Sequence, residues 1–184
     1  MGLSLESMAI VMPTVHGHPN RAGFRGVLTI VDVASDKSPS GARGHRVLLT
    51  RRAAEAAIPS LMGMGLDYSP ALDRHDAQRK IGVITRAEIV GRMIEVGGFL
   101  YARDFPEIVA EIGRPGRTGM SVSAGAARNV RASRAGLGMS YEITDALVED
   151  IKASVWVLNR VTFTGAAVLR RDKAAYCSTW IELG

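Results

Sequence analysis

Cysteine, aromatic residues and long apolar runs are scarce in this sequence, and each scarcity excludes a class of protein. Cys177 is the single cysteine among 184 residues, so the chain forms no internal disulfide and holds no cysteine-rich zinc site. No apolar run approaches the ~18 residues that a membrane-spanning helix needs, and the N-terminal residues lack the basic start of a signal peptide. We therefore expect a soluble, non-membrane protein of a reducing compartment.

The overall composition is that of an ordinary globular protein. Hydrophobic residues make up 47% of the chain and charged residues 22%, a balance that excludes extended disorder. A length of 184 residues suffices for one domain with a core and is short for two. The sequence therefore predicts a single domain over residues 1–184.

Acidic residues are missing from one segment, residues 113–136, although the net charge of the whole chain is only +5. A solvated loop or insertion is the simplest interpretation, and a docking surface is the alternative. The segment lacks the interleaved aromatic residues on which single-stranded nucleic acids stack. We therefore favour an acidic protein partner over nucleic acid, whose binding would weaken steeply with salt. The arginines concerned are Arg114, Arg117, Arg128, Arg131 and Arg134.

Runs of β-branched residues separated by turn-forming stretches predict most of the secondary structure. Residues 1–23 show no clear period, and strands are expected at residues 24–33, 45–50, 81–85, 89–101 and 155–163. The pair Gly97-Gly98 indicates a bulge or a close backbone approach within one of them. The pattern predicts an α+β fold on a mostly antiparallel curved sheet or small β-barrel.

Two short helices are expected between these strands. Thr50 is a suitable N-cap for the first, and Pro59 would stop it. Asp104 would open the second with Glu107 completing a capping box, and Gly113 would end it.

The segment from Leu137 to Ile143 combines a small-residue entry with Ser140 in a short apolar strand. Most serines in strands are structural, because their hydroxyls only bond locally. Serine hydrolysis also needs a base, a group that orients the base, and N–H donors for the oxyanion. The best base is His75, which only tertiary folding can bring to Ser140. In a strand, Glu142 lies on the same face as Ser140, which makes it our third catalytic candidate.

Several alternatives to this constellation remain open. Gly119-Met120-Ser121 repeats Gly138-Met139-Ser140, so Ser121 is an alternative nucleophile. His16 and His18 flank Gly17, but a two-histidine set is too small for a metal site, and we predict no metal or cofactor. The further candidates are Ser123 as nucleophile, His16, His18 and His45 as bases, and Asp73, Asp76 and Asp145 as acids.

Residues 47–180 resemble the prohead (capsid-maturation) proteases of tailed bacteriophages. The resemblance depends on the order and spacing of short segments rather than on any one of them. These segments are Arg74-His75-Asp76 with Ile81-Gly82-Val83-Ile84-Thr85, Gly98-Phe99-Leu100-Tyr101 with Asp104-Phe105-Pro106-Glu107, Leu137-Gly138-Met139-Ser140-Tyr141-Glu142, and Val161-Thr162-Phe163-Thr164-Gly165-Ala166-Ala167-Val168-Leu169 with Lys173-Ala174-Ala175-Tyr176.

The resemblance implies a serine endopeptidase with a β-barrel similar to that of herpesvirus assembly proteases. Such an enzyme would work in the host cytoplasm, inside the phage prohead, as a homo-oligomer that cleaves scaffold protein and major capsid protein. The family histidine falls on His75 and the serine on Ser140. The acid expected in the last core strand falls near Asn159 or Arg160, neither of which is acidic. The chain therefore recruits another carboxylate, or it is a catalytically decayed structural capsid or head-assembly protein on the same fold.

Overall fold

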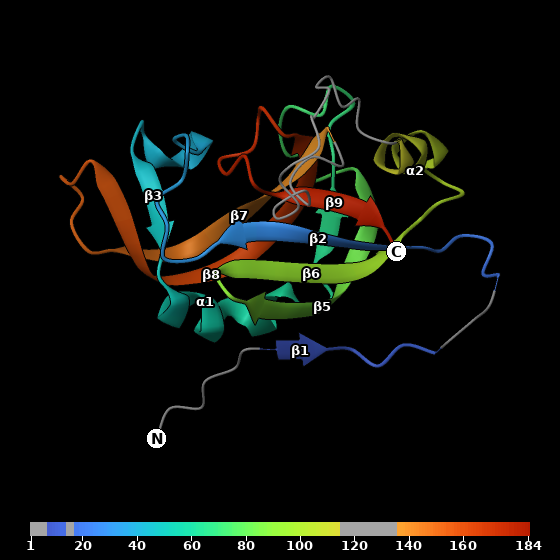
Figure 1. The fold of residues 1–184 in the computed structure, drawn as a ribbon, viewed down its shortest axis with the longest axis horizontal. Helices are drawn as coiled ribbons and strands as arrows, with labels where there is room; N and C mark the ends of the chain where they lie inside the picture. Colours follow the sequence, from blue (N-terminus) through green and yellow to red (C-terminus); the bar gives the residue numbers. More distant parts are fainter. Residues whose placement is uncertain (1–6, 14–16, 115–135) are drawn as a thin grey trace, which may run out of the picture.

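One curled mixed sheet dominates the computed structural model, which describes residues 7–13, 17–114 and 136–184. Figure 1 shows the sheet bending through about half of a barrel. The strands are β1 (Ser7–Ala9), β2 (Ala22–Ile30), β3 (Arg46–Leu49), β4 (Gly65–Asp67), β5 (Lys80–Val90), β6 (Met93–Leu100), β7 (Leu137–Val148), β8 (Val155–Arg170) and β9 (Trp180–Leu183). The helices are α1 (Arg51–Ala57) and α2 (Pro106–Gly113), with 3-10 turns at Ser40–Ala42 and Ile58–Leu61.

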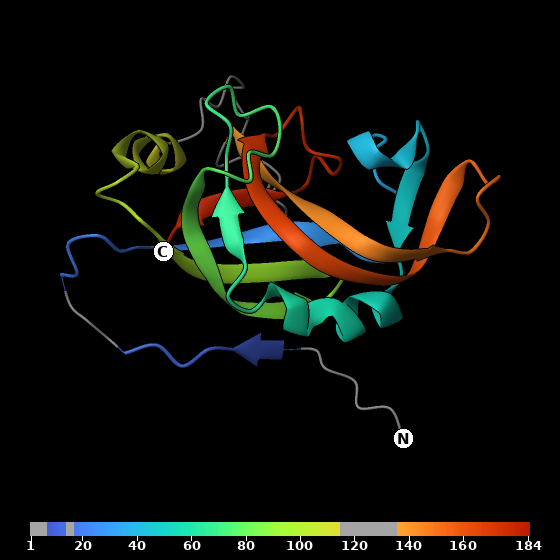
Figure 2. The same cartoon turned by 180° about the vertical axis from the view of Figure 1, so that it is seen from behind.

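Among the described residues the strands follow the order β3-β8-β4-β5-β6-β2-β9, while β1 pairs with β5 and β7 with β8. All pairings are antiparallel except those of β3 and β4 with β8. The two parallel strands follow one another along the same edge of β8, β3 beside Val155–Leu158 and β4 beside Ala166–Ala167, and the segment with α1 connects them (Figure 2). The α+β class and the curved, mostly antiparallel sheet are confirmed.

Among the described residues β8 is the longest strand, and it pairs with other strands along both of its edges. Ala166 pairs with Tyr141 of β7 and also with Leu66 of β4, so these two strands lie on opposite edges of β8. Leu158 likewise pairs with β7 and with β3. One edge of β8 is therefore lined by β7, and the other is shared by β3 and β4.

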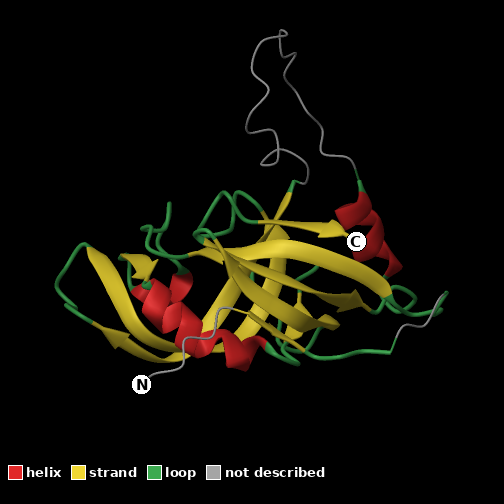
Figure 3. Cartoon of the chain, turned by 60° about the horizontal axis from the view of Figure 1, so that its bottom comes forward, coloured by secondary structure: helices red, strands yellow, loops and turns green. Residues whose placement is uncertain are grey.

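The inner face of the curled sheet carries the core. Phe163 is 2% exposed, and its ring lies 5.4 Å from that of Tyr141 in a perpendicular arrangement. Leu28, Ile84 and Ile94 from three further strands are fully buried in the same cluster. Helix α1 packs its buried alanines against β8 and lies in front of the sheet in Figure 3.

The Gly97-Gly98 pair marks a close backbone approach, as the sequence predicts. A Cβ at Gly98 would lie 1.9 Å from the carbonyl oxygen of Val83, which leaves no room for a side chain. The pairing of β5 with β6 shifts register beside it, between Ile84 and Arg86. The glycines thus allow β2 and β5, the two neighbours of β6, to approach its backbone closely.

The helix predictions are confirmed in one case and partly wrong in the other. The Thr50 hydroxyl accepts from the Ala53 N–H at 3.2 Å, as expected for an N-cap. The capping box at Asp104 is wrong, because α2 begins after Phe105 and has no side-chain cap. Asp104 instead accepts from the Asn20 amide at 2.7 Å, and Glu107 accepts from the Tyr68 hydroxyl at 2.6 Å.

Three strand predictions also need correction. The strand predicted over residues 89–101 crosses a hairpin turn between β5 and β6, where Gly91 has a φ of 60°. Residues 1–23 are not irregular throughout, because Ser7–Ala9 pairs with β5. The short strand β4 is not among the strands that the sequence predicts. No helix in the described part of the chain is long and apolar enough to cross a membrane.

Candidate active site

The candidate nucleophile lies in a row of three residues across β7, β8 and β4. Ser140 pairs with Ala167 of β8, and Ala167 pairs on its other edge with Asp67 of β4. Residues paired across neighbouring strands point to the same face of a sheet. Ser140 and Asp67 therefore share one face, two strand spacings or about 10 Å apart.

The loop between β4 and β5 positions His75 on this face, and three hydrogen bonds hold the loop in place. The Leu72 N–H bonds to the Ser69 carbonyl at 2.8 Å, and the Leu72 carbonyl accepts from the Arg170 N–H at 2.7 Å. The Asp76 N–H donates to Asp67 Oδ1 at 3.1 Å. The loop is thus fixed immediately after His75.

The imidazole of His75 lies between two carboxylates. Its Nδ1 is 3.6 Å from Asp67 Oδ1 and 3.8 Å from Glu142 Oε1. Both ring nitrogens are buried without a hydrogen-bond partner among the described residues. With Nδ1 facing the acids, Nε2 is the nitrogen left for a hydroxyl, as in serine hydrolases.

Asp67 is the more constrained of the two acids. Its side chain is fully buried, and Oδ2 accepts from Lys80 Nζ at 3.0 Å. Burial alone would raise the pKa of Asp67. The interactions with His75, Lys80 and the Asp76 N–H outweigh burial and lower the pKa below its ordinary value. A carboxylate that stays ionised can orient an imidazole and stabilise its protonated form.

Small residues in the middle of β8 make room for this cluster. A Cβ at Gly165 would lie 2.7 Å from Glu142 Oε2, so the Glu142 carboxylate rests directly over Gly165. Ala167 lies between Ser140 and Asp67 in the row described above. Larger side chains at these two positions would occupy the space that Glu142 and His75 use.

Ser140, His75 and Glu142 line one cavity of about 750 Å³. Tyr141, which follows Ser140, packs its ring against Phe163 of the core. Burial raises the pKa of Tyr141 to about 12, so its phenol stays neutral and cannot act as a base at neutral pH. Ser38, Ser40 and Thr164 also line the cavity, and Ser140 differs from them in lying in one row with Ala167 and Asp67.

The structure brings Ser140, His75 and Glu142 together and adds Asp67, which the sequence analysis missed. The available signal was an acid that follows Leu66 directly within an apolar stretch, a position that burial permits only with partners. This signal is weak in the sequence, because β4 has only three residues and no strand period is visible around Asp67.

The other acidic candidates have different partners. Asp73 accepts from the Ser69 hydroxyl at 2.8 Å, a bond that lowers the pKa of Asp73. Asp76 pairs with Arg79 at 3.3 Å. On the last core strand, Asn159 donates to Glu149 and Arg160 donates to the Asp145 carbonyl, both beyond the Ser140 row. The two non-acidic residues at which the resemblance expects an acid therefore lie outside the Ser140 row as well.

The remaining predicted residues lie elsewhere or outside the described residues. The ring of His45 stacks on Trp156 with centroids 4.6 Å apart. Arg114 forms a salt bridge with Glu111 at the end of α2. The predictions for His16, Ser121, Ser123, Arg117, Arg128, Arg131 and Arg134 fall outside the described residues.

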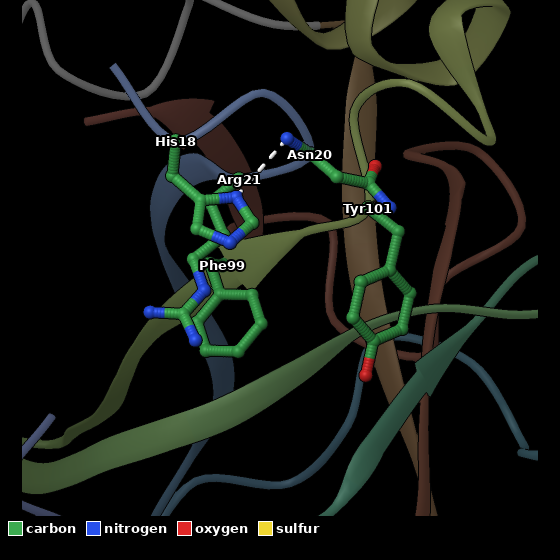
Figure 4. A pocket seen from close by; sticks show the side chains of 5 residues that line it. All are labelled: His18, Asn20, Arg21, Phe99 and Tyr101. Atoms are coloured by element: carbon green, nitrogen blue, oxygen red, sulfur yellow. Dashed lines mark hydrogen bonds between the residues drawn. The ribbon is translucent and has the colours of Figure 1, made fainter. Parts of the chain in front are cut away.

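A smaller, open cavity of about 340 Å³ lies near the start of β2, beside the end of β6 (Figure 4). His18 Nδ1 accepts from the Asn20 N–H at 3.1 Å, and the Arg21 guanidinium lies 4.6 Å from the centre of the Phe99 ring. No serine or cysteine of the described residues lines it, so on their evidence it does not compete with the Ser140 cavity as a nucleophilic site. The described residues contain no group of three or more His, Cys, Asp or Glu side chains that could hold a metal ion.

Comparison of the chain with protein-family models, with curated proteins and with solved structures finds no match.

Proposed function

We propose that the protein is a serine endopeptidase with Ser140 as nucleophile, His75 as general base and acid, and Asp67 as the group that orients His75. One observation carries the proposal. His75 Nδ1 lies 3.6 Å from a buried carboxylate, Nε2 has no hydrogen-bond partner among the described residues, and His75 and Ser140 line the same cavity. The order acid, imidazole, hydroxyl is what peptide hydrolysis by serine requires.

The proposed reaction is acyl transfer in two halves. His75 Nε2 takes the proton from the Ser140 hydroxyl as its oxygen attacks the peptide carbonyl carbon. The proton then passes to the leaving amine, the C–N bond breaks, and an acyl-serine ester remains. Water, deprotonated by His75, attacks the ester and releases the acid and the free serine. The negative charge of Asp67 stabilises the imidazolium in both halves.

The substrate class and setting of this proposal come from the resemblance to prohead proteases. We infer that the chain cleaves scaffold and major capsid segments inside an immature phage head, on a fold similar to that of herpesvirus assembly proteases. A half-barrel sheet that joins the His75 and Ser140 segments in one cavity supports this inference.

A small fluorophosphonate tests the chemistry directly, since it reacts only with an activated serine. We expect labelling of Ser140, no labelling in Ser140→Ala, and loss of peptidase activity in that variant with an unchanged thermal midpoint. Ser121→Ala is the matched control and should keep both labelling and activity. Activity lost in Ser121→Ala and kept in Ser140→Ala would disprove the assignment.

A second function is favoured by the absence of an acid at Asn159 and Arg160, where the resemblance expects one. The chain would then be a structural head-assembly protein on the same fold. Absence of fluorophosphonate labelling, together with an intact chain in finished particles, would support this alternative.

A further inference from the structure

The Ser140 cavity is chemically asymmetric along its length. At one end it is lined by His75, Ser140 and Glu142, all polar. At the other end Val47, Leu158 and Trp156 line it, and the first two are only 4% and 2% exposed. A single cavity thus joins a reactive polar end to an apolar end.

The two ends are far apart along the sheet. Val148, which also lines the apolar end, stands eight positions after Ser140 on β7 and pairs with Leu158. At ~3.3 Å per residue the separation is about 26 Å along a straight strand, and less along this bent one. An extended peptide of roughly six to eight residues covers that length.

The apolar end is held in shape by contacts within the chain. The Trp156 indole N–H donates to the Ile151 carbonyl at 3.1 Å, and its ring stacks on His45. The loop of residues 37–42 forms another wall and is tied to the far side of the cavity, since the Lys37 N–H bonds to the Ala175 carbonyl at 3.2 Å. A pre-ordered apolar wall binds a side chain without a large ordering cost.

We propose that the apolar end is a remote specificity pocket that binds a bulky apolar side chain of the substrate, about six residues from the bond that is cut. The inference rests on the proposed function, because it takes the cavity to be the peptide-binding site. The occupant is an extended substrate segment, since the pocket continues without a break from Ser140 and a free small molecule would not need that continuity. A bulky aliphatic or aromatic side chain there buries its surface against Val47, Leu158 and Trp156.

Gly41 is the position at which added bulk tests this pocket. It is an exposed residue that lines the cavity, and a Cβ there would meet no atom within 4 Å, so Gly41→Phe enlarges the cavity wall without displacing neighbours. Gly23→Phe is the matched control, because Gly23 is exposed on β2 away from the cavity and its Cβ would make only an ordinary contact at 3.6 Å.

Binding is measured without catalysis, in a Ser140→Ala, Trp180→Phe protein whose remaining tryptophan, Trp156, reports on the pocket. Two twelve-residue Ser/Gly peptides are compared, one with a Leu-Phe pair near one end and one with Ser-Ser there. We expect saturable Trp156 emission changes and at least tenfold tighter binding of the Leu-Phe peptide. Gly41→Phe should remove that preference and Gly23→Phe should keep it. Equal binding of the two peptides, absence of binding, or a preference that survives Gly41→Phe would overturn the inference.

Hydrolysis by the protein with Ser140 intact separates this inference from the proposed function. If the Leu-Phe preference in binding is present but neither peptide nor any longer substrate is cleaved, the peptidase proposal fails and the pocket stands. If cleavage depends on Ser140 but not on the Leu-Phe pair, the pocket fails and the peptidase stands.

Discussion

The two edges of β8 contribute to the candidate site in opposite ways. The β4 edge provides Asp67, whose side chain is fully buried and bonded to Lys80 and to the Asp76 N–H. The β7 edge provides Glu142, whose side chain is 50% exposed and approaches His75 Nδ1 at 3.8 Å, its one ion pair within the described part of the chain. Both acids face the same ring nitrogen, but only one is fixed.

This difference indicates how the site divides its work. A buried, hydrogen-bonded carboxylate keeps its charge and position, so the β4 edge can set the orientation of the imidazole. An exposed carboxylate is screened by water and can move aside, which suits an edge that a substrate must approach. Substitutions on the two edges of β8 test this division.

Asp67→Asn should have the largest effect on catalysis. The amide can still accept from the Asp76 N–H, but it removes the charge that holds the imidazole in its reactive tautomer. We expect kcat to fall on the order of 10³-fold with little change in KM, by analogy with the loss of the acid in serine proteases. The measurement is steady-state hydrolysis of a cleaved peptide, with circular dichroism to verify folding. A fall of less than tenfold would show that Asp67 does not orient the base.

The loss of folding stability at low pH should also depend on Asp67. Its pKa is lowered in the folded protein, so its contribution is complete above the unfolded-state pKa near 4 and is lost as pH falls through the folded-state value. We expect urea midpoints to drop below about pH 4, and to drop less steeply in Asp67→Asn. Identical slopes in the two proteins would show that Asp67 is not ionised and paired in the folded state.

The sequence predicts those parts of the site that depend on residues close to one another in the chain. Ser140 and Glu142 are two positions apart on one strand, so their shared face follows from the strand period alone. The Thr50 cap is local in the same way. The β7–β8 pairing and the arrival of His75 over it depend on tertiary contacts, and the sequence could only propose them.

Asp67 shows the limit of local reasoning most clearly. Its strand is three residues long, too short for a period to be visible, and it pairs with β8 across about 100 residues of chain. Asp104 and Glu107 show the converse error. Their spacing matches a capping box, yet Asn20 and Tyr68, both distant in sequence, provide the partners that these carboxylates actually have.

Glu142→Gln should reduce activity much less than Asp67→Asn. The exposed carboxylate adds a screened attraction to His75 that its amide does not replace, so we expect a loss of about three- to tenfold in kcat/KM and a change in unfolding free energy within ~0.5 kcal/mol. Raising the salt concentration should shrink the difference between Glu142→Gln and the unaltered protein. An effect as large as that of Asp67→Asn, insensitive to salt, would reverse the division between the two edges.

Gly165→Ala should have the smallest effect, and it isolates the position of the Glu142 carboxylate from its charge. The added methyl would meet Glu142 Oε2 at 2.7 Å, the far end of a flexible, half-exposed side chain that can swing away. We expect a change in unfolding free energy of no more than about 1 kcal/mol, measured by urea denaturation. Gly98→Ala is the contrast, because its methyl would meet a Val83 backbone oxygen at 1.9 Å and should destabilise the fold severely.

The activity of Gly165→Ala then shows whether the position of the Glu142 carboxylate over Gly165 matters for catalysis. If it does, Gly165→Ala loses as much kcat/KM as Glu142→Gln, and the double variant loses no more than either, because both remove the same contact with His75. Additive losses would mean that Gly165 serves the site independently, as space for the imidazole itself. In that case Gly165 of β8 contributes room for the imidazole, separately from the charge of Glu142 on β7.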